Sequence, residues 1–331
     1  MNKSNTFSFS SKFEGRLDKA VLSVVGELTR SQVEKAIKNG LVYVDGKPCL
    51  KCGTKIKVGQ SILVTLDLPT ADGPAQNIFD VSLPIIFETE RFFAVDKPSG
   101  LVVHPGAGAR IPTVLDFVLK KNNRKVEDLP DPALYGFVHR LDKDTSGVLL
   151  IAKDQVSQRA LSKLFENRQV KKTYIAVAHL TSAGLFRTSK RGLIHCWIKR
   201  DSKNRLKYKC FPTKVSQSRE AVTRYEKLAW LDDLAILILE PVTGRTHQLR
   251  SQCEFVKCPI VNDPLYCRLE ATKIKNSEIR EILTKAKRLM LHALKLEFSD
   301  PFTGNKICIK AELPVEFSKI VKILNVPNLD L

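Results

Sequence analysis

Short runs rich in Val, Ile, Leu, Phe and Tyr recur beyond residue 78 and constrain the fold more than any other feature of the chain. They are FFAVDKP at 92–98, GVLLIAK at 147–153, KTYIAVAHL at 172–180, AVTRYEKLA at 221–229, LAILILEP at 234–241, MLHALKLEF at 290–298 and NKICIKAEL at 305–313. β-Branched and aromatic residues fit the pleated surface of a sheet, so each run predicts a strand. DQVSQRALSKLFEN at 154–167 predicts a helix that Asp154 caps. Strands and helices do not alternate strictly, which predicts an α+β fold with a mixed, mostly antiparallel β-sheet and flanking helices.

Residues 15–66 predict a separate small unit in which two helices precede a small sheet. Apolar residues recur at helical spacing in two stretches, Leu17, Ala20, Val21 and Val24, and then Val33, Ala36 and Ile37. Thr29 is a candidate cap for the second helix, Gly40 is a candidate stop, and Asp45-Gly46 is a signal for a tight hairpin. About 50 residues give only a marginal core, so we expect this unit to be a module of a larger protein.

The domain boundaries follow from a change in composition. DLPTADGPAQN at 67–77 is rich in Pro, Gly, Asp and Ala, which is typical of a linker. We therefore expect a small domain at 1–68, a linker at 69–77 and a large domain at 78–331, in line with the roughly two domains that 331 residues suggest.

The net charge of the chain indicates what kind of partner it binds. Lys and Arg number 54 against 35 Asp and Glu, which gives a formal charge of +19. Residues 187–224 alone carry twelve Lys or Arg and two acids. Such an excess favours a polyanion as partner, although a basic protein without one has the same composition. No apolar run approaches the roughly 20 residues of a membrane-spanning helix, and residues 1–15 lack the apolar core of a secretory signal. We expect a cytoplasmic protein with no membrane partner.

Metal and redox chemistry have little support in the sequence. The eight cysteines follow no disulfide framework, and Cys49-x-x-Cys52 has no second Cys or His pair at matching spacing. His139, His247 and His292 form no HExxH pair and favour structural roles. HPGAGAR at 104–110 lacks the Gly-Lys-Ser/Thr of a phosphate loop. We expect neither a metal nor a cofactor.

Asp142 is the strongest candidate for a functional group. It stands in HRLDKDTSG at 139–147, at the start of an apolar strand, where loss of water would favour its protonated form. A guanidinium within reach would keep it ionised, and both Arg140 and Arg245 are candidates. A purely structural Asp–Arg pair fits the same pattern. Asp144 is followed by Thr, Ser and Gly, a pattern typical of a turn. Tyr174 either packs in the core or places its ring against a base.

These motifs together resemble a known family. HRLDKDTSG followed by GVLLIAK resembles the signature of the RluA-type pseudouridine synthases. KKTYIAV, AVTRYEKL, PVTGRTHQLR, CPIVNDPLY and LMLHALKLEFSDPFTG follow in that family's order, and VDKPSGLVVHPGAG is similar to its opening motif. The amino-terminal unit resembles the small RNA-binding fold of ribosomal small-subunit protein four, which is often fused to the RluC and RluD branches. The resemblance covers residues from about 80 to 315.

The resemblance implies a reaction and a set of roles. Uridines in large-subunit ribosomal RNA would become pseudouridine without a cofactor, on a monomeric enzyme with the pseudouridine synthase fold. Asp142 would be the catalytic carboxylate, Arg245 would hold it ionised, and Tyr174 would stack on the flipped uracil. Arg140 would enter the space that the base leaves. In the small domain, the expected RNA-binding residues are Arg16, Lys19, Arg30, Lys35 and Lys38.

Other functions remain open at this point. Ser251-Gln252 and Asn262 stand where the family more often has Val-His and Gly, which leaves the substrate in doubt. Transfer RNA is an alternative substrate, and a non-catalytic RNA-binding factor in ribosome assembly is an alternative function. DKDTS also resembles the nucleophile loop of haloacid-dehalogenase-type phosphatases, but Ser146 departs from that pattern and FVHRL is a poor buried strand.

Overall fold

A computed structural model describes residues 5–11, 14–24, 30–66, 79–104, 111–121 and 136–326. The described residues up to Leu66 belong to one compact unit, and those from Phe79 onward belong to another. The linker predicted at 69–77 lies outside the described residues. Each unit has its own hydrophobic core, as a separate domain requires.

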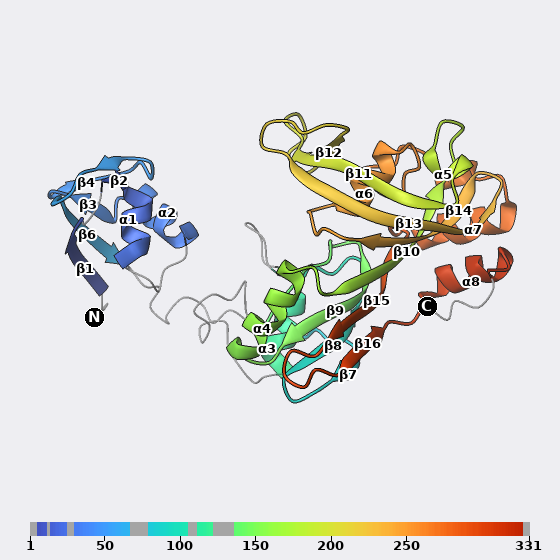
Figure 1. Ribbon diagram of the computed structural model, residues 1–331, viewed down its shortest axis with the longest axis horizontal. Coiled ribbons are helices and arrows are strands. Elements are labelled where there is room, and N and C mark those ends of the chain that lie inside the picture. Colours follow the sequence, from blue (N-terminus) through green and yellow to red (C-terminus); the bar gives the residue numbers. More distant parts are fainter. Residues whose placement is uncertain are drawn as a thin grey trace. The chain divides into compact units, whose positions relative to one another are not determined.

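The small unit pairs two helices with a four-stranded sheet. Its elements are β1 (Asn5–Ser10), β2 (Gly15–Arg16), α1 (Leu17–Val24), α2 (Arg30–Lys38), β3 (Val42–Val44), β4 (Lys47–Pro48), β5 (Lys55–Ile56) and β6 (Ser61–Leu66). The sheet has the order β1-β6-β3-β4, and β2 pairs separately with β5 (Figure 1). Leu17, Val21 and Ile37 are fully buried in its core, as the predicted helical faces require. Val24 departs from the prediction, because it ends α1 and is 48% exposed. Asp45 and Gly46 have φ of 48° and 76°, as the predicted tight turn requires.

The large unit is built on a ten-stranded sheet in the order β12-β11-β13-β14-β10-β15-β9-β8-β7, with β16 paired to β15. The strands are β7 (Ile85–Glu88), β8 (Phe92–Lys97), β9 (Ser146–Ala152), β10 (Lys171–His179), β11 (Arg191–Arg200), β12 (Tyr208–Phe211), β13 (Arg219–Leu231), β14 (Leu234–Pro241), β15 (Leu291–Ser299) and β16 (Lys306–Lys310). Among the pairings in the described residues, β9 with β15 is parallel and the others are antiparallel. The predicted fold class is confirmed, and so is each predicted strand.

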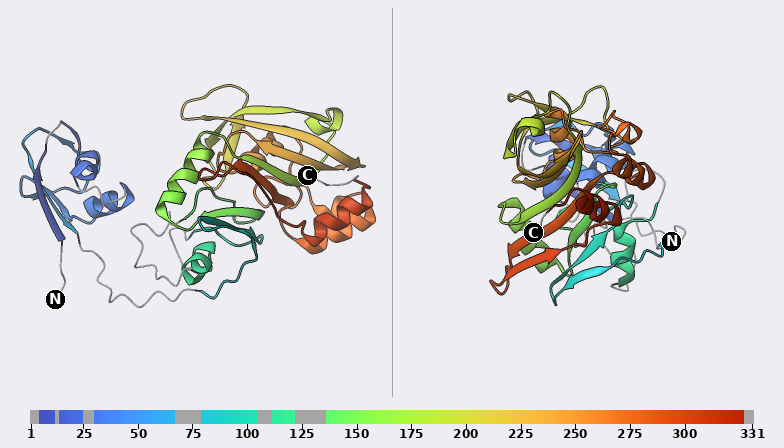
Figure 2. Two further views of the ribbon diagram at one scale, coloured as in Figure 1. Left: turned by 60° about the horizontal axis from the view of Figure 1, so that its bottom comes forward. Right: turned by 90° about the vertical axis from the view of Figure 1, so that its right-hand side faces the viewer.

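Helices flank this sheet at both of its ends. They are α3 (Val114–Lys121), α4 (Gln155–Glu166), α5 (Leu185–Thr188), α6 (Gln248–Phe255), α7 (Ser277–Ala286) and α8 (Val315–Ile323). Figure 2 (left) shows α3 and α4 beside the part of the sheet that β8 and β9 form. Asp154 caps α4 as predicted, because its carboxylate accepts a hydrogen bond from the Ser157 amide at 2.8 Å. In the described part of the chain, the helices are too short or too polar to cross a bilayer.

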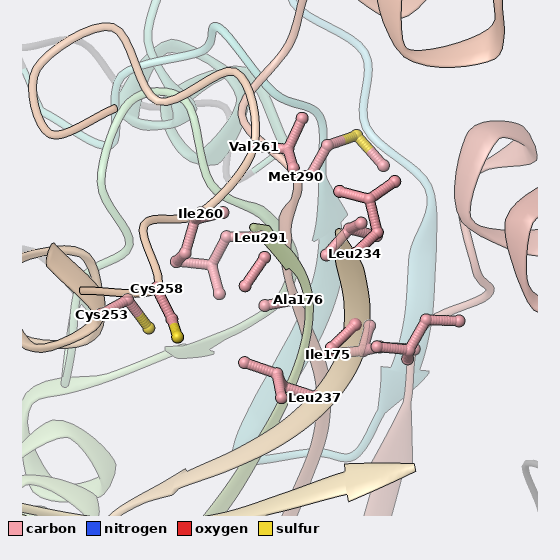
Figure 3. Packing of buried hydrophobic residues seen from close by; sticks show 14 of the residues in the cluster. Ile175, Ala176, Leu234, Leu237, Cys253, Cys258, Ile260, Val261, Met290 and Leu291 are labelled. Atoms are coloured by element: carbon pink, nitrogen blue, oxygen red, sulfur yellow. The ribbon is translucent and has the colours of Figure 1, made fainter. Parts of the chain in front are cut away.

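The core that positions the site lies where β10, β14 and β15 meet. Ile175, Ala176, Leu237 and Leu291 are buried there, and Cys253 of α6 packs against them (Figure 3). β15 lies between β9 and β10 in the sheet, although it follows both by more than a hundred residues in sequence. The amino-terminal ends of β9 and β10 are therefore brought together by a strand from the last part of the chain.

Candidate active site

The largest group of predicted site residues lines one pocket of about 450 Å³ in the large unit. Its walls come from the loop before β9, the end of α4, the start of β10 and the segment between β14 and α6. Arg140, Asp142, Tyr174 and Arg245 all lie on these walls. The volume is within the range of pockets that hold a small ligand.

Hydrogen bonds from Lys97 and Ser99 hold the loop that carries Asp142. The ammonium of Lys97, which is fully buried, donates hydrogen bonds to the carbonyl oxygens of Pro98, Leu101 and Lys143 at 2.9, 2.8 and 3.0 Å. The hydroxyl of Ser99 donates to the carbonyl oxygen of Asp144 at 2.6 Å. Burial lowers the pKa of Lys97 to about 7, although three carbonyl acceptors match the three donors of an ammonium.

Gly147 allows the close pairing of β9 with β15 behind the loop. Its φ is 112°, and a Cβ atom there would lie 2.2 Å from the carbonyl oxygen of Ala293. In this parallel pairing, Ser146 faces His292 and Gly147 faces Ala293. Only glycine combines that backbone conformation with that approach, so the sequence Ser146-Gly147 sets where the loop ends and the strand begins.

Asp142 meets a buried arginine, but not the predicted one. Nη1 of Arg250 donates to Oδ2 of Asp142 at 3.2 Å. The same guanidinium is bidentate on Asp263, with Nε to Oδ2 at 2.7 Å and Nη2 to Oδ1 at 2.8 Å. Burial alone would lower the pKa of Arg250, but the hydrogen bonds and charges of Asp263 and Asp142 raise it above its ordinary value. A permanently charged guanidinium therefore faces the Asp142 carboxylate.

The expectation that Arg245 pairs with Asp142 is wrong in this structure. Arg245 precedes α6, and its Nε donates to the carbonyl oxygen of Glu220 at 3.0 Å. Arg250 lies inside the helix, where its side chain is only 3% exposed. Arg140, the other candidate partner, is exposed where it lines the pocket. Sequence alone offered two arginines in RTHQLR and no measure of which one is buried.

Tyr174 projects into the pocket from the start of β10. Burial, and then the negative charge of Asp142, raise the pKa of its phenol above the ordinary value. The ring is therefore a neutral aromatic surface beside the carboxylate.

His247 lines the pocket and is backed by Tyr208 and Tyr266, an arrangement that sequence reasoning did not anticipate. His247 adopts a left-handed φ of 54° immediately before α6, and its Nε2 lies 4.0 Å from Oδ2 of Asp142. Its Nδ1 lies 3.0 Å from the hydroxyl oxygen of Tyr266, and the Tyr208 amide donates to that same oxygen at 2.7 Å. Burial lowers the pKa of His247, so the ring is neutral near pH 7.

A basic wall, which we define as Arg168, Lys172 and Arg245, closes another side of the pocket. Burial, and then the charge of Arg168, lower the pKa of Lys172. Burial, and then Arg219 and Arg168, lower the pKa of Arg245. Within the described residues, neither Arg168 nor Lys172 forms an ion pair with an acid. Three cations on one side of the pocket, two of them without an acid in ion-pair contact, favour an anion there.

The RNA-binding residues predicted in the small unit differ in how far the structure describes them. Arg16 forms a bidentate pair with Asp18, with both N–O distances at 2.9 Å, and this hydrogen bond raises the pKa of Arg16. Lys19 and Lys38 are exposed. The side chains of Arg30 and Lys35 in α2, and the candidate cap Thr29, lie outside the described residues.

Possible metal ligands are sparse in the ranges that the structure describes. There, no three His, Cys, Asp or Glu side chains come together as a metal site would need. Cys49 and Cys52 are free thiols, and Sγ of Cys49 lies 3.1 Å from the hydroxyl of Thr54.

Comparison with known proteins decides the family. Residues 91–255 match the family model described as RNA pseudouridylate synthase. The chain is 32% identical to the ribosomal large subunit pseudouridine synthase D of Xanthomonas campestris pv. campestris, over 93% of this chain and 88% of the relative. It is also 32% identical to an uncharacterized RNA pseudouridine synthase of Helicobacter pylori strain J99, over 92% and 89%. The chain belongs to the RNA pseudouridine synthases. They are isomerases, and the resemblance seen in the motifs is confirmed.

The fold and the small unit agree with this family. The human protein RNA pseudouridylate synthase domain containing 4 superposes with a TM-score of 0.55 at 24% identity, over 74% of this chain and 94% of that one. A second human relative, domain containing 1, gives a TM-score of 0.52 at 20% identity, over 78% and 98%. Residues 15–62 match the S4 domain model. This RNA pseudouridine synthase thus joins an S4 domain to its catalytic unit.

Proposed function

We propose that this pseudouridine synthase acts on uridines of large-subunit ribosomal RNA and that Asp142 is its catalytic carboxylate, without a cofactor. The observation that carries the proposal is the contact of Asp142 with Arg250 at 3.2 Å inside a pocket of about 450 Å³. A charged guanidinium favours the ionised form of a carboxylate beside it. The ribosomal target is supported by the names of the relatives from Xanthomonas campestris and Vibrio cholerae, both ribosomal large subunit pseudouridine synthase D.

The reaction needs an unprotonated carboxylate at the sugar end of the substrate. The bond between C1′ and N1 of uracil breaks, the base turns, and a bond forms between C1′ and C5. C5 then loses a proton and N1 takes one up. An ionised Asp142 can attack C1′, add to the ring or remove a sugar proton, and each route begins from the same charged state. No external reagent enters this balance, because product and substrate are isomers.

The base must leave its stack before it can turn, at a cost of a few kcal/mol. Tyr174 offers a neutral ring at the pocket wall on which an extruded uracil can stack. Arg140 is exposed beside Asp142, where it can fill the space left in the RNA. The basic wall can hold phosphates next to the extruded nucleotide, which offsets part of the cost.

The S4 domain supplies a second contact with RNA in this proposal. Lys19 and Lys38 are exposed there, Arg16 lies in β2 immediately before α1, and Arg30 and Lys35 add to the basic composition of α2. Because its substrate is a ribosomal precursor, we place the enzyme in the cytoplasm and expect it to act as a monomer.

The test is tritium release from unmodified large-subunit ribosomal RNA that carries [5-³H]uridine. Wild-type protein and D144N should release tritium, because Asp144 lies in the same loop without the contact to Arg250. D142N should lose activity by a factor on the order of a thousand or more while it still binds RNA. Release that persists in D142A would contradict the role of Asp142. Faster release from transfer RNA would change the substrate, and no release by wild-type protein would favour a non-catalytic assembly factor.

A further inference from the structure

His247 lines the pocket, and among the described residues its Nε2 has no hydrogen-bond partner. Its left-handed φ of 54° is uncommon for a residue other than glycine, although His is among the types that adopt it more often. Its side chain is 17% exposed, and the 4.0 Å from Nε2 to Asp142 is too long for a hydrogen bond. Among the described residues, Nε2 therefore keeps its hydrogen-bonding capacity for whatever enters the pocket.

The surroundings of Tyr266 decide whether Nε2 is a donor or an acceptor. The hydroxyl oxygen of Tyr266 already accepts a hydrogen bond from the Tyr208 amide at 2.7 Å. Tyr266 is only 2% exposed, so its own hydroxyl proton needs an acceptor within the protein. In the described part of the chain, the acceptor at hand is Nδ1 of His247, at 3.0 Å. A neutral imidazole that accepts at Nδ1 carries its proton on Nε2.

The ring has little freedom to change this orientation. Tyr208 and Tyr266 both present their rings nearly edge-on to His247, each with a centroid distance of 5.7 Å. Asp263 fixes the segment that carries Tyr266, because its Oδ1 accepts hydrogen bonds from the amides of Leu265 and Tyr266 at 2.9 and 3.0 Å. The N–H of His247 is thus aimed by the same carboxylate that anchors Arg250.

We propose that His247 donates its Nε2–H to a carbonyl oxygen of the bound uracil, and that Tyr266 is the positioning residue that holds it in this tautomer. The inference rests on the proposed function and adds a contact that reads the base. Uracil presents carbonyl oxygens at C2 and C4, whereas its N3–H is a donor. A fixed N–H beside Asp142 would favour a base with an acceptor at that position and would align C1′ with the carboxylate.

A thio-substituted substrate tests the contact directly. Short RNA substrates with uridine, 2-thiouridine or 4-thiouridine at the target position are converted by wild-type protein and by H247A. Sulfur accepts hydrogen bonds poorly, so one thio substitution should lower the wild-type kcat/KM by roughly three- to tenfold. H247A should be slower on uridine by a similar factor and insensitive to that thio substitution, because the two changes remove one interaction. Equal thio sensitivity in wild-type protein and H247A would overturn the proposal.

Two controls separate contact from folding. H195A removes an exposed histidine of β11 and should keep the wild-type thio sensitivity. H247N keeps a residue type that tolerates the left-handed backbone. H247N and H247A should both unfold at the wild-type urea concentration. The losses in H247A would then not be due to a misfolded loop. An H247A protein that unfolds much earlier than H247N would attribute the loss to folding and count against a substrate contact.

The tautomer is measured on the full-length protein without substrate. In ¹⁵N-histidine-labelled protein, the His247 signal, assigned by its absence in H247N, should show a protonated Nε2 and an unprotonated Nδ1. Y266F should shift this signal toward a mixture of tautomers and lower kcat/KM by a smaller factor than H247A does. A protonated Nδ1 in the wild-type protein would refute the positioning role. Because this readout needs no RNA, it stands even if wild-type protein converts no uridine, which would count against the proposed function alone.

Discussion

Arg250 and Asp142 lie 108 residues apart in the sequence, yet their side chains meet at 3.2 Å. Arg250 is shared, because Asp263 holds two of its nitrogens. One guanidinium therefore serves two carboxylates. Two nitrogens of the guanidinium hold the structural partner Asp263, and the remaining Nη1 donates to Asp142 at the pocket.

Substitution of Arg250 should damage the fold far more than substitution of Arg245. R250Q leaves the fully buried Asp263 without its partner, which costs about 3–5 kcal/mol in the free energy of unfolding. R245Q removes a hydrogen bond to one backbone carbonyl and should cost about 1 kcal/mol. Urea unfolding followed by fluorescence measures this, because both tryptophans, Trp197 and Trp230, lie in the catalytic unit. Equal midpoints for the two variants would contradict the assignment of the buried ion pair.

Lys172 should contribute to RNA binding through charge. K172Q removes one phosphate contact, so the slope of log Kd against log salt should become shallower by about one unit. The matched control is K285Q, which removes a lysine of α7 that is 76% exposed and pairs with Glu281. Binding titrations at several salt concentrations distinguish them, and the same slope in K172Q and K285Q would exclude Lys172 from the RNA contact.

Gly147 and Gly244 should respond very differently to a single methyl group. In G147A the new Cβ would meet the Ala293 carbonyl oxygen at 2.2 Å in a left-handed backbone, so the loss of stability should reach several kcal/mol. Gly244 has its nearest neighbour at 4.0 Å, so G244A should fold normally. Thermal unfolding of the two variants checks this. A G147A protein as stable as wild type would mean that β9 and β15 are not paired so closely.

Most of the strands could be predicted from the sequence, and so could four of the residues that line the pocket. Strands such as LAILILEP at 234–241 are continuous apolar runs whose type needs no tertiary information. β11 escaped prediction because Gly192, His195 and its terminal cations interrupt the apolar pattern, and only its neighbours in the sheet make it a strand. Asp142 and Tyr174, which both line the pocket, were singled out from the motifs HRLDKDTSG and KKTYIAV.

The pairing of Asp142 could not be read from the sequence for a physical reason. Whether Arg245 or Arg250 faces the carboxylate depends on where α6 begins, and a left-handed residue at His247 sets that point. Nothing in RTHQLR specifies a positive φ at the histidine, because His adopts it in a minority of cases. Asp263, thirteen residues after Arg250, stabilises the outcome through contacts that only the folded chain brings together.

His139 should make the catalytic unit sensitive to acid. Its Nε2 accepts a hydrogen bond from the Leu150 amide at 2.9 Å, and burial lowers its pKa to about 3. The unfolded chain, with a pKa near 6.5, therefore takes up the proton first. Stability should fall by up to about 1.4 kcal/mol per pH unit for this group as pH drops from 6.5 toward 3.

Urea unfolding at pH 7.5 and 5.5 measures this slope. H139Q should reduce it by roughly one proton, whereas H195Q, at an exposed position, should leave it unchanged. His292, whose pKa burial also lowers to about 3, should account for a similar share in H292Q. A slope in H139Q identical to wild type would show that His139 titrates alike in the folded and unfolded chains.

Removal of the S4 domain should separate binding from chemistry. A chain without residues 1–66 should bind ribosomal RNA more weakly and with a shallower salt dependence, since fewer phosphates are contacted. Its single-turnover rate at saturating enzyme should stay within about threefold of wild type, because Asp142, Tyr174 and Arg250 all belong to the other unit. Unchanged affinity would remove the S4 domain from RNA binding.

The central position of β15 in the sheet has a consequence for how the protein folds during translation. During translation, β9 and β10 leave the exit tunnel long before Leu291 is added. The strand that lies between them in the sheet, β15, is then still missing. We therefore expect the nascent chain to hold Asp142 and Tyr174 on two separate parts of the sheet, and stalled chains that end before residue 290 to bind RNA without modifying it. About the last eighth of the chain completes the sheet, so we expect catalysis to begin only when synthesis is nearly finished.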